Sequence, residues 1–124
     1  MRYITIDGDD VGQKITSAYL KNDLSTLAEI NQLVNRKTNL IADFLEQCGF
    51  VVIFCAADGV AGYCEKDEVD EDFIFGRIKD IANEQMTFSA GIGNSLRESY
   101  VALLSAKSSG KACLRNFESL SNDV

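Results

Sequence analysis

The alternation of apolar and polar positions divides the chain into segments with two different periods. Short apolar runs rich in β-branched and aromatic side chains, which are typical of strands, lie at residues 3–6, 50–55, 60–64 and 86–92. Apolar residues that recur every three or four positions, as on one face of a helix, lie at residues 11–19, 26–48, 70–83 and 96–108. The pattern therefore predicts a strand, two helices, two strands, a helix, a strand and a helix, in that order.

Local signals set the expected ends of these segments. Two capping boxes are expected, formed by Thr26 with Glu29 and by Ser95 with Glu98. The run at 50–55 is continuously apolar, which favours a central strand buried on both faces. Residues 111–114 are expected to form a short edge strand or an extended segment, and residues 118–124 a frayed tail.

This order of elements is that of the split-βαβ, ferredoxin-like arrangement, with an extra C-terminal helix and edge strand. We therefore predict an α+β fold of the βαββαβ type, formed by one domain over residues 1–117. In such a fold the first strand neighbours the hairpin at 50–64. Asp7, at the end of the first strand, and Asp58, in the hairpin turn, are then expected at the same end of the sheet.

Composition narrows the class of protein. An apolar content of 46% and a charged content of 25% are ordinary for a globular domain. No apolar run is long enough to span a bilayer, and the chain enters a strand without a signal peptide, so we expect a cytoplasmic protein with no membrane contact. The chain has no histidine, and its four cysteines lack C-x-x-C spacing. This argues against zinc and against histidine-based catalysis, and we interpret the cysteines as buried reduced thiols.

A net charge of −7 argues against direct binding to DNA or RNA, since nucleic-acid binders normally present a basic face. Much of the acidity lies at residues 65–72, which we interpret as a solvated loop that starts a helix. Phosphate binding by this chain would therefore depend on metal ions and on a few local lysines.

The most concentrated candidate chemistry follows the first strand, where the chain reads Asp7-Gly8-Asp9-Asp10-Val11-Gly12. Carboxylates at the end of a central strand suit a hard divalent cation such as Mg²⁺. Glycine permits close backbone approach, so the Gly8 carbonyl is a further candidate ligand, and the N–H groups of residues 10–12 could face a phosphate. Alternatively, this is a simple strand-to-helix turn in which Asp10 caps the helix.

Two further features lie elsewhere in the sequence but are expected nearby in the fold. Asp58-Gly59 is ordinary hairpin chemistry on its own, yet Asp58 beside Asp7 could hold one or two Mg²⁺ ions about 4 Å apart. Lys107 and Lys111, four residues apart, would share one helical face. The alternative is that these lysines compensate the dipole at the end of a helix.

Taken together, these motifs resemble a known superfamily over almost the whole chain. The motif at 7–12, the hairpin Ala56-Ala57-Asp58-Gly59, and the strand and helix that lead to Lys107 and Lys111 are similar to the motifs of palm-domain nucleotidyl cyclases. These include the GGDEF diguanylate cyclases and the palm of the type III CRISPR large subunit. The small size and the Asp-Gly-Asp-Asp-Val-Gly start look most like the stand-alone minimal CRISPR polymerases. That family implies a role in prokaryotic anti-phage defence and the synthesis of cyclic oligonucleotides.

The resemblance implies roles for individual residues. The catalytic metal carboxylates correspond to Asp7 and Asp58. Two further metal contacts, from a backbone carbonyl and from a second acid, correspond to Gly8 and Asp9. The residues expected to contact the nucleotide, with the two lysines on its triphosphate, are Asp10, Val11, Gly12, Ala57, Gly59, Lys107 and Lys111.

The implied reaction joins nucleoside triphosphates, with ATP as the expected substrate, into a cyclic di- or oligonucleotide and releases pyrophosphate. Mg²⁺ or Mn²⁺ is the implied cofactor, and no protein nucleophile is needed. Since two nucleotides must face each other, we expect a homodimer with two half-sites. A separate effector is expected to read the product.

The hairpin departs from the family pattern, which usually reads Gly-Gly-Asp followed by a second acid. Here Ala56 and Ala57 precede Asp58, and Gly59 replaces the second acid. Alternatives therefore include a palm domain of reduced activity that binds nucleotide or cyclic nucleotide, a palm enzyme similar to a GTP cyclohydrolase, and a ferredoxin-like dimerisation module. Analysis of the products formed from each nucleoside triphosphate separates these possibilities.

Overall fold

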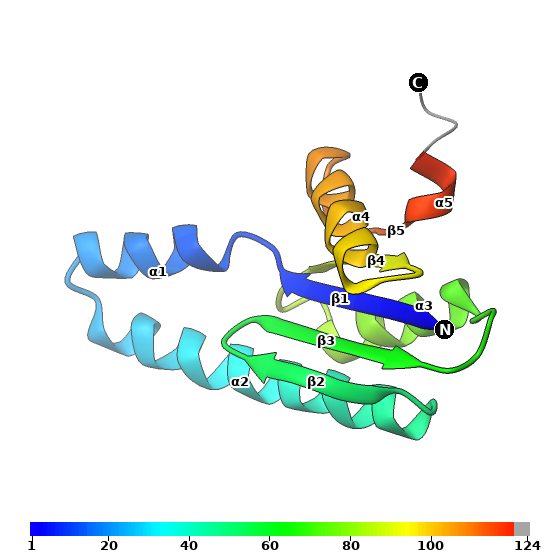
Figure 1. Ribbon diagram of the computed structural model, residues 1–124. Helices are drawn as coiled ribbons and strands as arrows, with labels where there is room; N and C mark the ends of the chain where they lie inside the picture. Colours follow the sequence, from blue (N-terminus) through cyan, green and yellow to red (C-terminus); the bar gives the residue numbers. More distant parts are fainter. Residues whose placement is uncertain (121–124) are drawn as a thin grey trace.

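The structure, a computed structural model that describes residues 1–120, combines one β-sheet with helices (Figure 1). In chain order the elements are β1 (Arg2–Gly8), α1 (Val11–Leu20), α2 (Leu24–Gln47), β2 (Val51–Ala56), β3 (Gly59–Cys64), α3 (Glu71–Ala82), β4 (Phe88–Gly93), α4 (Leu96–Ser108), β5 (Leu114–Asn116) and α5 (Phe117–Leu120). The strand order is β2-β3-β1-β4-β5, with antiparallel neighbours except for β4 and β5, which run parallel. This confirms the predicted α+β, ferredoxin-like fold with an added helix α4 and edge strand β5.

The sheet packs against α2 and α3 on one face and against α4 on the other (Figure 1). Strand β1 shows the alternation that this requires. Ile4 and Ile6 are fully buried in the core, whereas Thr5 and Asp7 point toward α4. Large side chains from the neighbouring elements complete the core, among them Ile41, Leu45, Ile78 and Phe88. Each fully buried side chain of this kind contributes about 1.5–3 kcal/mol, so the core fixes β1 and the acidic segment that follows it.

Helix α4 lies very close to β4 because a glycine faces it. A Cβ atom on Gly91 would lie 2.2 Å from the backbone nitrogen of Leu103 and 2.2 Å from the backbone oxygen of Ser99. On the neighbouring strand, Thr5 Oγ1 and Ser99 Oγ share a hydrogen bond of 2.7 Å. The helix is thereby held over β1 and β4, and its C-terminal end reaches the end of β1.

Strand β2 lies at the edge of the sheet, so the prediction of a central strand at 50–55 is wrong. Val51 and Phe54 are 51% and 56% exposed, and the register with β3 shifts between Val52 and Phe54. A continuous apolar run cannot distinguish a strand covered on both faces from an edge strand with an open face. Here α4 packs on β1 and β4, which leaves the α4 face of β2 open.

The helix caps follow the predicted chemistry in part. The Asp23 carboxylate caps α2, because it accepts hydrogen bonds from the Thr26 backbone N–H at 3.1 Å and from the Thr26 hydroxyl at 2.7 Å. The predicted capping box of Thr26 with Glu29 is therefore wrong, and the helix begins earlier. At α4 the Ser95 hydroxyl accepts from the Glu98 N–H at 3.1 Å, as predicted.

The C-terminal segment is more regular than the pattern predicts. Strand β5 begins at Leu114, so it shares only this residue with the edge strand or extended segment predicted at 111–114. It pairs in parallel with β4. Residues 118–120 belong to α5 rather than to a frayed tail, and Arg2 Nη1 lies 2.9 Å from the Glu118 carboxylate. The rest of the predicted tail, residues 121–124, lies outside the described residues.

The cysteines are free thiols that are buried to different degrees. Cys64 is buried, and Cys48 and Cys113 are partly buried. Cys55 is exposed, contrary to the prediction, because it lies on the edge strand β2. Among residues 1–120, no helix is long and apolar enough to cross a bilayer.

We predict that Gly91→Ala lowers the free energy of unfolding by about 2–3 kcal/mol, since the added methyl group must displace the backbone of α4. Gly76→Ala is the matched control. A Cβ atom on Gly76, within α3, would meet nothing within 4 Å, so this change should stabilise the protein by about 0.5–1 kcal/mol. Urea unfolding followed by circular dichroism measures both. Equal stability of the two variants would contradict the close packing of α4.

Candidate active site

Backbone hydrogen bonds hold the end of β1 against the tip of the β2–β3 hairpin. Asp7 pairs with Gly59 in the antiparallel ladder, and the Gly8 N–H donates to the Asp58 carbonyl at 2.9 Å. A Cβ atom on Gly8 would lie 3.2 Å from Asp58 Cβ. The structure therefore brings Asp7 and Asp58 together at one end of the sheet.

The two carboxylates repel each other. Burial raises the pKa of Asp7, and the negative charge of Asp58 raises it further. The Lys107 ammonium group, 3.2 Å from Asp7 Oδ2, acts in the opposite direction but does not cancel these effects. The ionised form of Asp7 is therefore less favoured than that of a free aspartate, even with Lys107 beside it.

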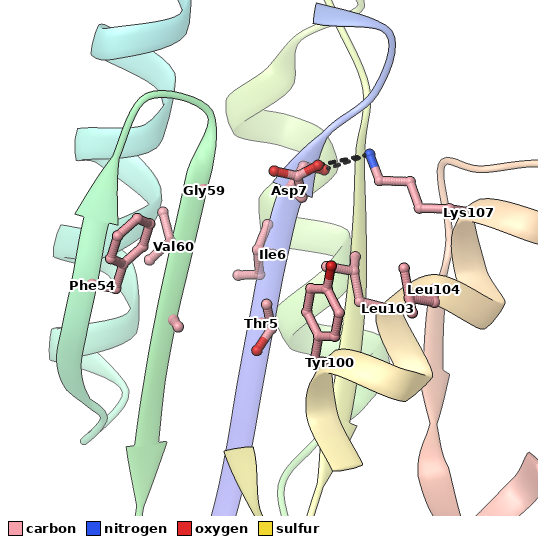
Figure 2. A pocket seen from close by; sticks show the side chains of 11 residues that line it. Thr5, Ile6, Asp7, Phe54, Gly59, Val60, Tyr100, Leu103, Leu104 and Lys107 are labelled. Carbon is pink, nitrogen blue, oxygen red and sulfur yellow. Dashed lines mark hydrogen bonds and ion pairs between the residues drawn. The ribbon is translucent and has the colours of Figure 1, made fainter. Parts of the chain in front are cut away.

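Lys107, in the last turn of α4, points its ammonium group at the end of β1 (Figure 2). Nζ donates to the Gly8 carbonyl at 2.8 Å and to the Asp9 carboxylate at 2.8 Å. Burial lowers the pKa of Lys107, but the hydrogen bond to Asp9 and the charge of Asp7 outweigh burial and raise the pKa above its usual value. The lysine therefore stays charged. It contacts oxygens of Asp7 and Gly8, two residues predicted from the family resemblance to bind a metal ion.

Asp9 is the buried member of the cluster, with 3% of its surface exposed. Its carboxylate accepts from the hydroxyls of Thr87 and Ser89 at 2.7 and 2.8 Å, from Lys107, and from the Ala112 N–H at 3.1 Å. Burial alone would raise the pKa of Asp9, but the hydrogen bonds from Lys107, Thr87 and Ser89 hold it below its usual value. Both carboxylate oxygens are thus occupied by protein donors, which makes Asp9 an anchor rather than a free metal ligand.

Asp10 and Lys111 form an ion pair beside this cluster. Asp10 has a φ of 62° at the N-cap position of α1, but its side chain makes no capping hydrogen bond. Lys111 lies in the loop after α4, which ends at Ser108, so the prediction that Lys107 and Lys111 share one helical face is wrong. Both lysines nonetheless reach the first motif, one from the helix and one from the loop.

A groove of about 690 Å³ opens between α1, α2 and the hairpin tip, and we call it the α1–α2 groove. Four of the predicted nucleotide and metal residues line it, namely Val11, Gly12, Ala57 and Asp58. Its volume lies within the roughly 300–1,000 Å³ that is typical of small-molecule sites. Gly59 lies outside this groove, opposite Asp7 in the ladder.

Sequence reasoning missed two polar side chains in the α1–α2 groove. Asn31 and Asn35 project from α2, and the Asn35 amide nitrogen donates to the Asn31 amide oxygen at 3.2 Å. Their four-residue spacing places both on one helical face, beside the apolar stripe. Amides have both donors and acceptors, which are the groups that recognise the edge of a nucleobase.

The donor set at the carboxylate pair fits a divalent cation that binds together with a phosphate. Mg²⁺ commonly takes one or two protein carboxylates and completes its shell with water and phosphate oxygens. Asp7, Asp58 and the Gly8 carbonyl supply such oxygens. A cation there would offset the burial of Asp7 and the negative charge of Asp58, the two effects that raise the Asp7 pKa. Within residues 1–120, no three side chains of the Asp, Glu, His or Cys types form a metal cage by themselves.

Together with the family match over residues 3–117, the ferredoxin-like sheet and its carboxylates at the ends of β1 and the hairpin indicate a palm-type nucleotide cyclase or polymerase-like domain. Residues 3–117 match the minimal CRISPR polymerase domain, and the chain belongs to that family. The resemblance inferred from the sequence motifs is thereby confirmed. No curated protein matches the sequence.

Solved structures with this fold include domains of known cyclases. The GGDEF domain of DgcB from Caulobacter crescentus, in complex with c-di-GMP, has a TM-score of 0.67 at 10% sequence identity. The match covers 94% of this chain and 77% of that one. The active GGEEF domain of a diguanylate cyclase from Vibrio cholerae has a TM-score of 0.68 at 15% sequence identity. The match covers 94% of this chain and 81% of that one. The Csm1–Csm4 cassette in complex with cA4 has a TM-score of 0.60 at 16% sequence identity. The match covers 89% of this chain and 20% of that one.

We predict that Asp9→Asn lowers the free energy of unfolding by about 3 kcal/mol, since it removes one charge of a buried pair with Lys107. Asp10→Asn is the matched control. The Asp10–Lys111 pair is exposed and asparagine tolerates a positive φ, so the loss should stay below about 1 kcal/mol. Chemical denaturation at pH 7 measures both variants. An Asp9→Asn protein as stable as Asp10→Asn would show that the buried carboxylate is not an anchor.

The difference in stability between the wild type and Asp9→Asn should depend on pH. The Asp9 pKa is lowered in the folded state, so its stabilising effect is complete above the unfolded-state pKa of about 3.9. That effect is lost as the pH falls through the folded-state pKa. The stability difference between the wild type and Asp9→Asn should therefore shrink below about pH 4.

Proposed function

We propose that this chain is a metal-dependent nucleotidyltransferase. It joins nucleoside triphosphates, with ATP as the expected substrate, into a cyclic di- or oligonucleotide and releases pyrophosphate. The observation that carries this proposal is that Asp7 and Asp58 meet at one end of the sheet, beside a groove large enough for a nucleoside. Two lysines contact the same acidic segment, Lys107 at Asp7 and Lys111 at Asp10. Membership of the minimal CRISPR polymerase family supports it.

The donor nucleotide is proposed to bind with its base in the α1–α2 groove, against Asn31 and Asn35. From there its triphosphate extends past Asp58 toward the beginning of α1. The first backbone N–H groups of α1 have no side-chain cap, and the helix dipole favours an anion there. Lys107 and Lys111 supply the positive charges for the terminal phosphates.

Asp7, Asp58 and the Gly8 carbonyl are the oxygens that would hold a divalent cation. When bound, such a cation polarises the α-phosphate and lowers the pKa of the attacking ribose hydroxyl. Lys107 donates to the Gly8 carbonyl in this structure, so it has to release that oxygen before a cation can take it. The released ammonium group can then pair with the triphosphate, while Asp9 keeps the segment in place.

The reaction needs no protein nucleophile. The ribose hydroxyl of an acceptor nucleotide loses its proton to solvent and bonds to the α-phosphorus of the donor. The bond from that phosphorus to the bridging oxygen breaks, and pyrophosphate leaves with the electron pair. The protein contributes positioning and charge neutralisation. Ring closure repeats this attack at a second site, which a homodimer would supply.

Similar structures support a cyclic product. The DgcB GGDEF domain is in complex with c-di-GMP, and the Csm1–Csm4 cassette is in complex with cA4. We also propose a role in cytoplasmic anti-phage defence, in which a separate effector reads the product. The CRISPR connection of the family supports that role.

We predict that Asp7→Ala and Asp58→Ala each lower the rate of pyrophosphate release by at least about a hundredfold, because each loses a charge that would bind the cation at the transition state. Asp80→Ala, an exposed aspartate on α3, is the control and should keep wild-type activity. Incubation with each nucleoside triphosphate and Mg²⁺ or Mn²⁺, followed by mass analysis, measures the products. Undiminished turnover in either site variant would exclude the assignment of that carboxylate.

The products also separate the alternative functions. Phosphodiester-linked products indicate nucleotidyl transfer, whereas an opened guanine ring indicates cyclohydrolase chemistry. Nucleotide binding that survives EDTA without release of pyrophosphate indicates a palm domain that only binds. Absence of both binding and turnover would leave a dimerisation module.

We predict that Asn31→Ala and Asn35→Ala each raise the KM for ATP about tenfold, the effect of losing hydrogen bonds to a base edge worth about 1.4 kcal/mol. Gln32→Ala is the control, because Gln32 is exposed on α2 and does not line the groove. Initial rates against ATP concentration give KM and kcat. An unchanged KM in both asparagine variants would place the base elsewhere.

A further inference from the structure

The outer edge of strand β2 lies open at one side of the sheet (Figure 1). Among residues 1–120, no strand pairs with this edge. The six residues of β2, Val51–Ala56, include no charged side chain, and the chain contains no proline. Ile53 is 48% exposed, beside the similarly exposed Val51 and Phe54. An apolar edge strand with free backbone groups is a template on which another strand can pair.

The opposite edge of the sheet is protected, which makes the contrast with β2 informative. Strand β5 is three residues long, contains Arg115 and is followed at once by α5. Short length and a charged side chain both discourage pairing with a further strand. Within β2 the bulge between Val52 and Phe54 is the one such device, and the strand pairs regularly with β3 on either side of it. Of the two edges, β2 is therefore the one that is available to a partner.

The position of helix α2 suits a second copy of the chain at this edge. Helix α2 packs on both β2 and β3, so it lies over the last two strands of the sheet. Antiparallel pairing of β2 with β2 of a second copy would bring the two α2 helices side by side. With neighbouring strands about 4.8 Å apart, the helix axes would lie roughly 8–10 Å apart, the usual distance between packed helices. Pairing at the edge would thus also bury the side of α2 beside β2.

The polar side chains on that side of α2 complement one another under two-fold symmetry. Cys55 Sγ on β2 lies 3.7 Å from Asn39 Oδ1, which places Asn39 on the side of α2 beside the edge. Residues four and seven positions away share this side, and they are Asn35 before Asn39, then Asp43 and Glu46 after it, all exposed. In antiparallel helices the acids of one copy lie opposite the amides of the other. Amide N–H groups can then donate to carboxylates, and like charges stay apart.

We infer that β2 pairs antiparallel with β2 of a second copy of this chain, which joins the two sheets into one. The interface is isologous, because the same strand and the same side of α2 serve both copies. The hairpin tips with Asp58 then lie at opposite ends of the shared edge, so the two candidate active sites do not meet there. This interface is therefore separate from the contact between half-sites in the proposed catalytic dimer, and it does not depend on nucleotidyl transfer.

Sedimentation without nucleotide or added metal ions tests the inference. The wild type should form a dimer, and Ile53→Lys should raise the dimer Kd at least about tenfold, since it places a charge on the edge. Leu20→Lys is the matched control and should leave the Kd unchanged, because Leu20 is 83% exposed at the end of α1 and not on the edge.

Thermal melting shows whether the variants are folded. Val51→Lys, at a second exposed position on β2, replaces Ile53→Lys if that variant does not fold. An unchanged Kd in a folded edge variant would overturn the inference. A monomeric wild type would also overturn it, and would leave the edge to a strand of a different protein.

Substitutions of Asn39 test the antiparallel arrangement of the α2 helices. Asn39→Asp should raise the dimer Kd about threefold, because it adds a carboxylate opposite the acids of the partner. Asn39→Lys should lower the Kd by a similar factor. Leu20→Lys adds the same charge elsewhere, so it separates this local effect from the change in net charge. Shifts of the Kd in the same direction for both Asn39 variants would contradict the arrangement.

Cys55 reports the pairing directly. It is an exposed free thiol on β2, and antiparallel pairing brings Cys55 of the two copies within reach of a bismaleimide with a six-carbon spacer. The wild type should give a covalent dimer, whereas Cys55→Ser, which keeps the other cysteines, should not. A wild type that sediments as a dimer but is not cross-linked through Cys55 would place the interface elsewhere and overturn the inference.

Discussion

One buried carboxylate holds the candidate site together. Asp9 accepts hydrogen bonds from two hydroxyls at the start of β4, from Lys107 on α4 and from the backbone of the loop before β5. An unpaired charge at so buried a position would cost several kcal/mol, so folding selects the arrangement in which all four donors are in place. The neighbours of Asp9 in sequence, Asp7 and Gly8, are fixed as a consequence, and the hairpin follows through the hydrogen bond from Gly8 to Asp58.

The charges of the site are balanced around this anchor. Lys107 pairs with Asp9 and also contacts Asp7 and the Gly8 carbonyl, so one ammonium group partly neutralises the end of β1. Burial, and after it the negative charge of Asp58, keeps the Asp7 pKa raised. The protein therefore folds with a charge imbalance that a divalent cation and a triphosphate together can correct.

The sequence predicted the fold and the meeting of Asp7 with Asp58, because apolar periodicity and hairpin chemistry are local signals that survive in tertiary structure. It did not predict that Asp9 is an anchor, since its donors lie about 80 to 100 residues away and hydroxyls leave no pattern in the chain. The apolar run of β2 could not reveal an edge strand, because edge position depends on which strands pair. The groove of about 260 Å³ between α4 and β3 depends on where α4 stops covering the sheet, and no short motif encodes that boundary.

The central claim is that Asp7 and Asp58 share a divalent cation beneath the triphosphate of a nucleotide. Anomalous scattering from crystals grown with Mn²⁺ and α,β-methylene ATP tests it most directly. We predict a manganese peak between the two carboxylates, within bonding distance of the Gly8 carbonyl and of phosphate oxygens, with Lys107 turned toward the triphosphate. A nucleotide bound in the α1–α2 groove with manganese located elsewhere, or with Lys107 still on the Gly8 carbonyl, would contradict it.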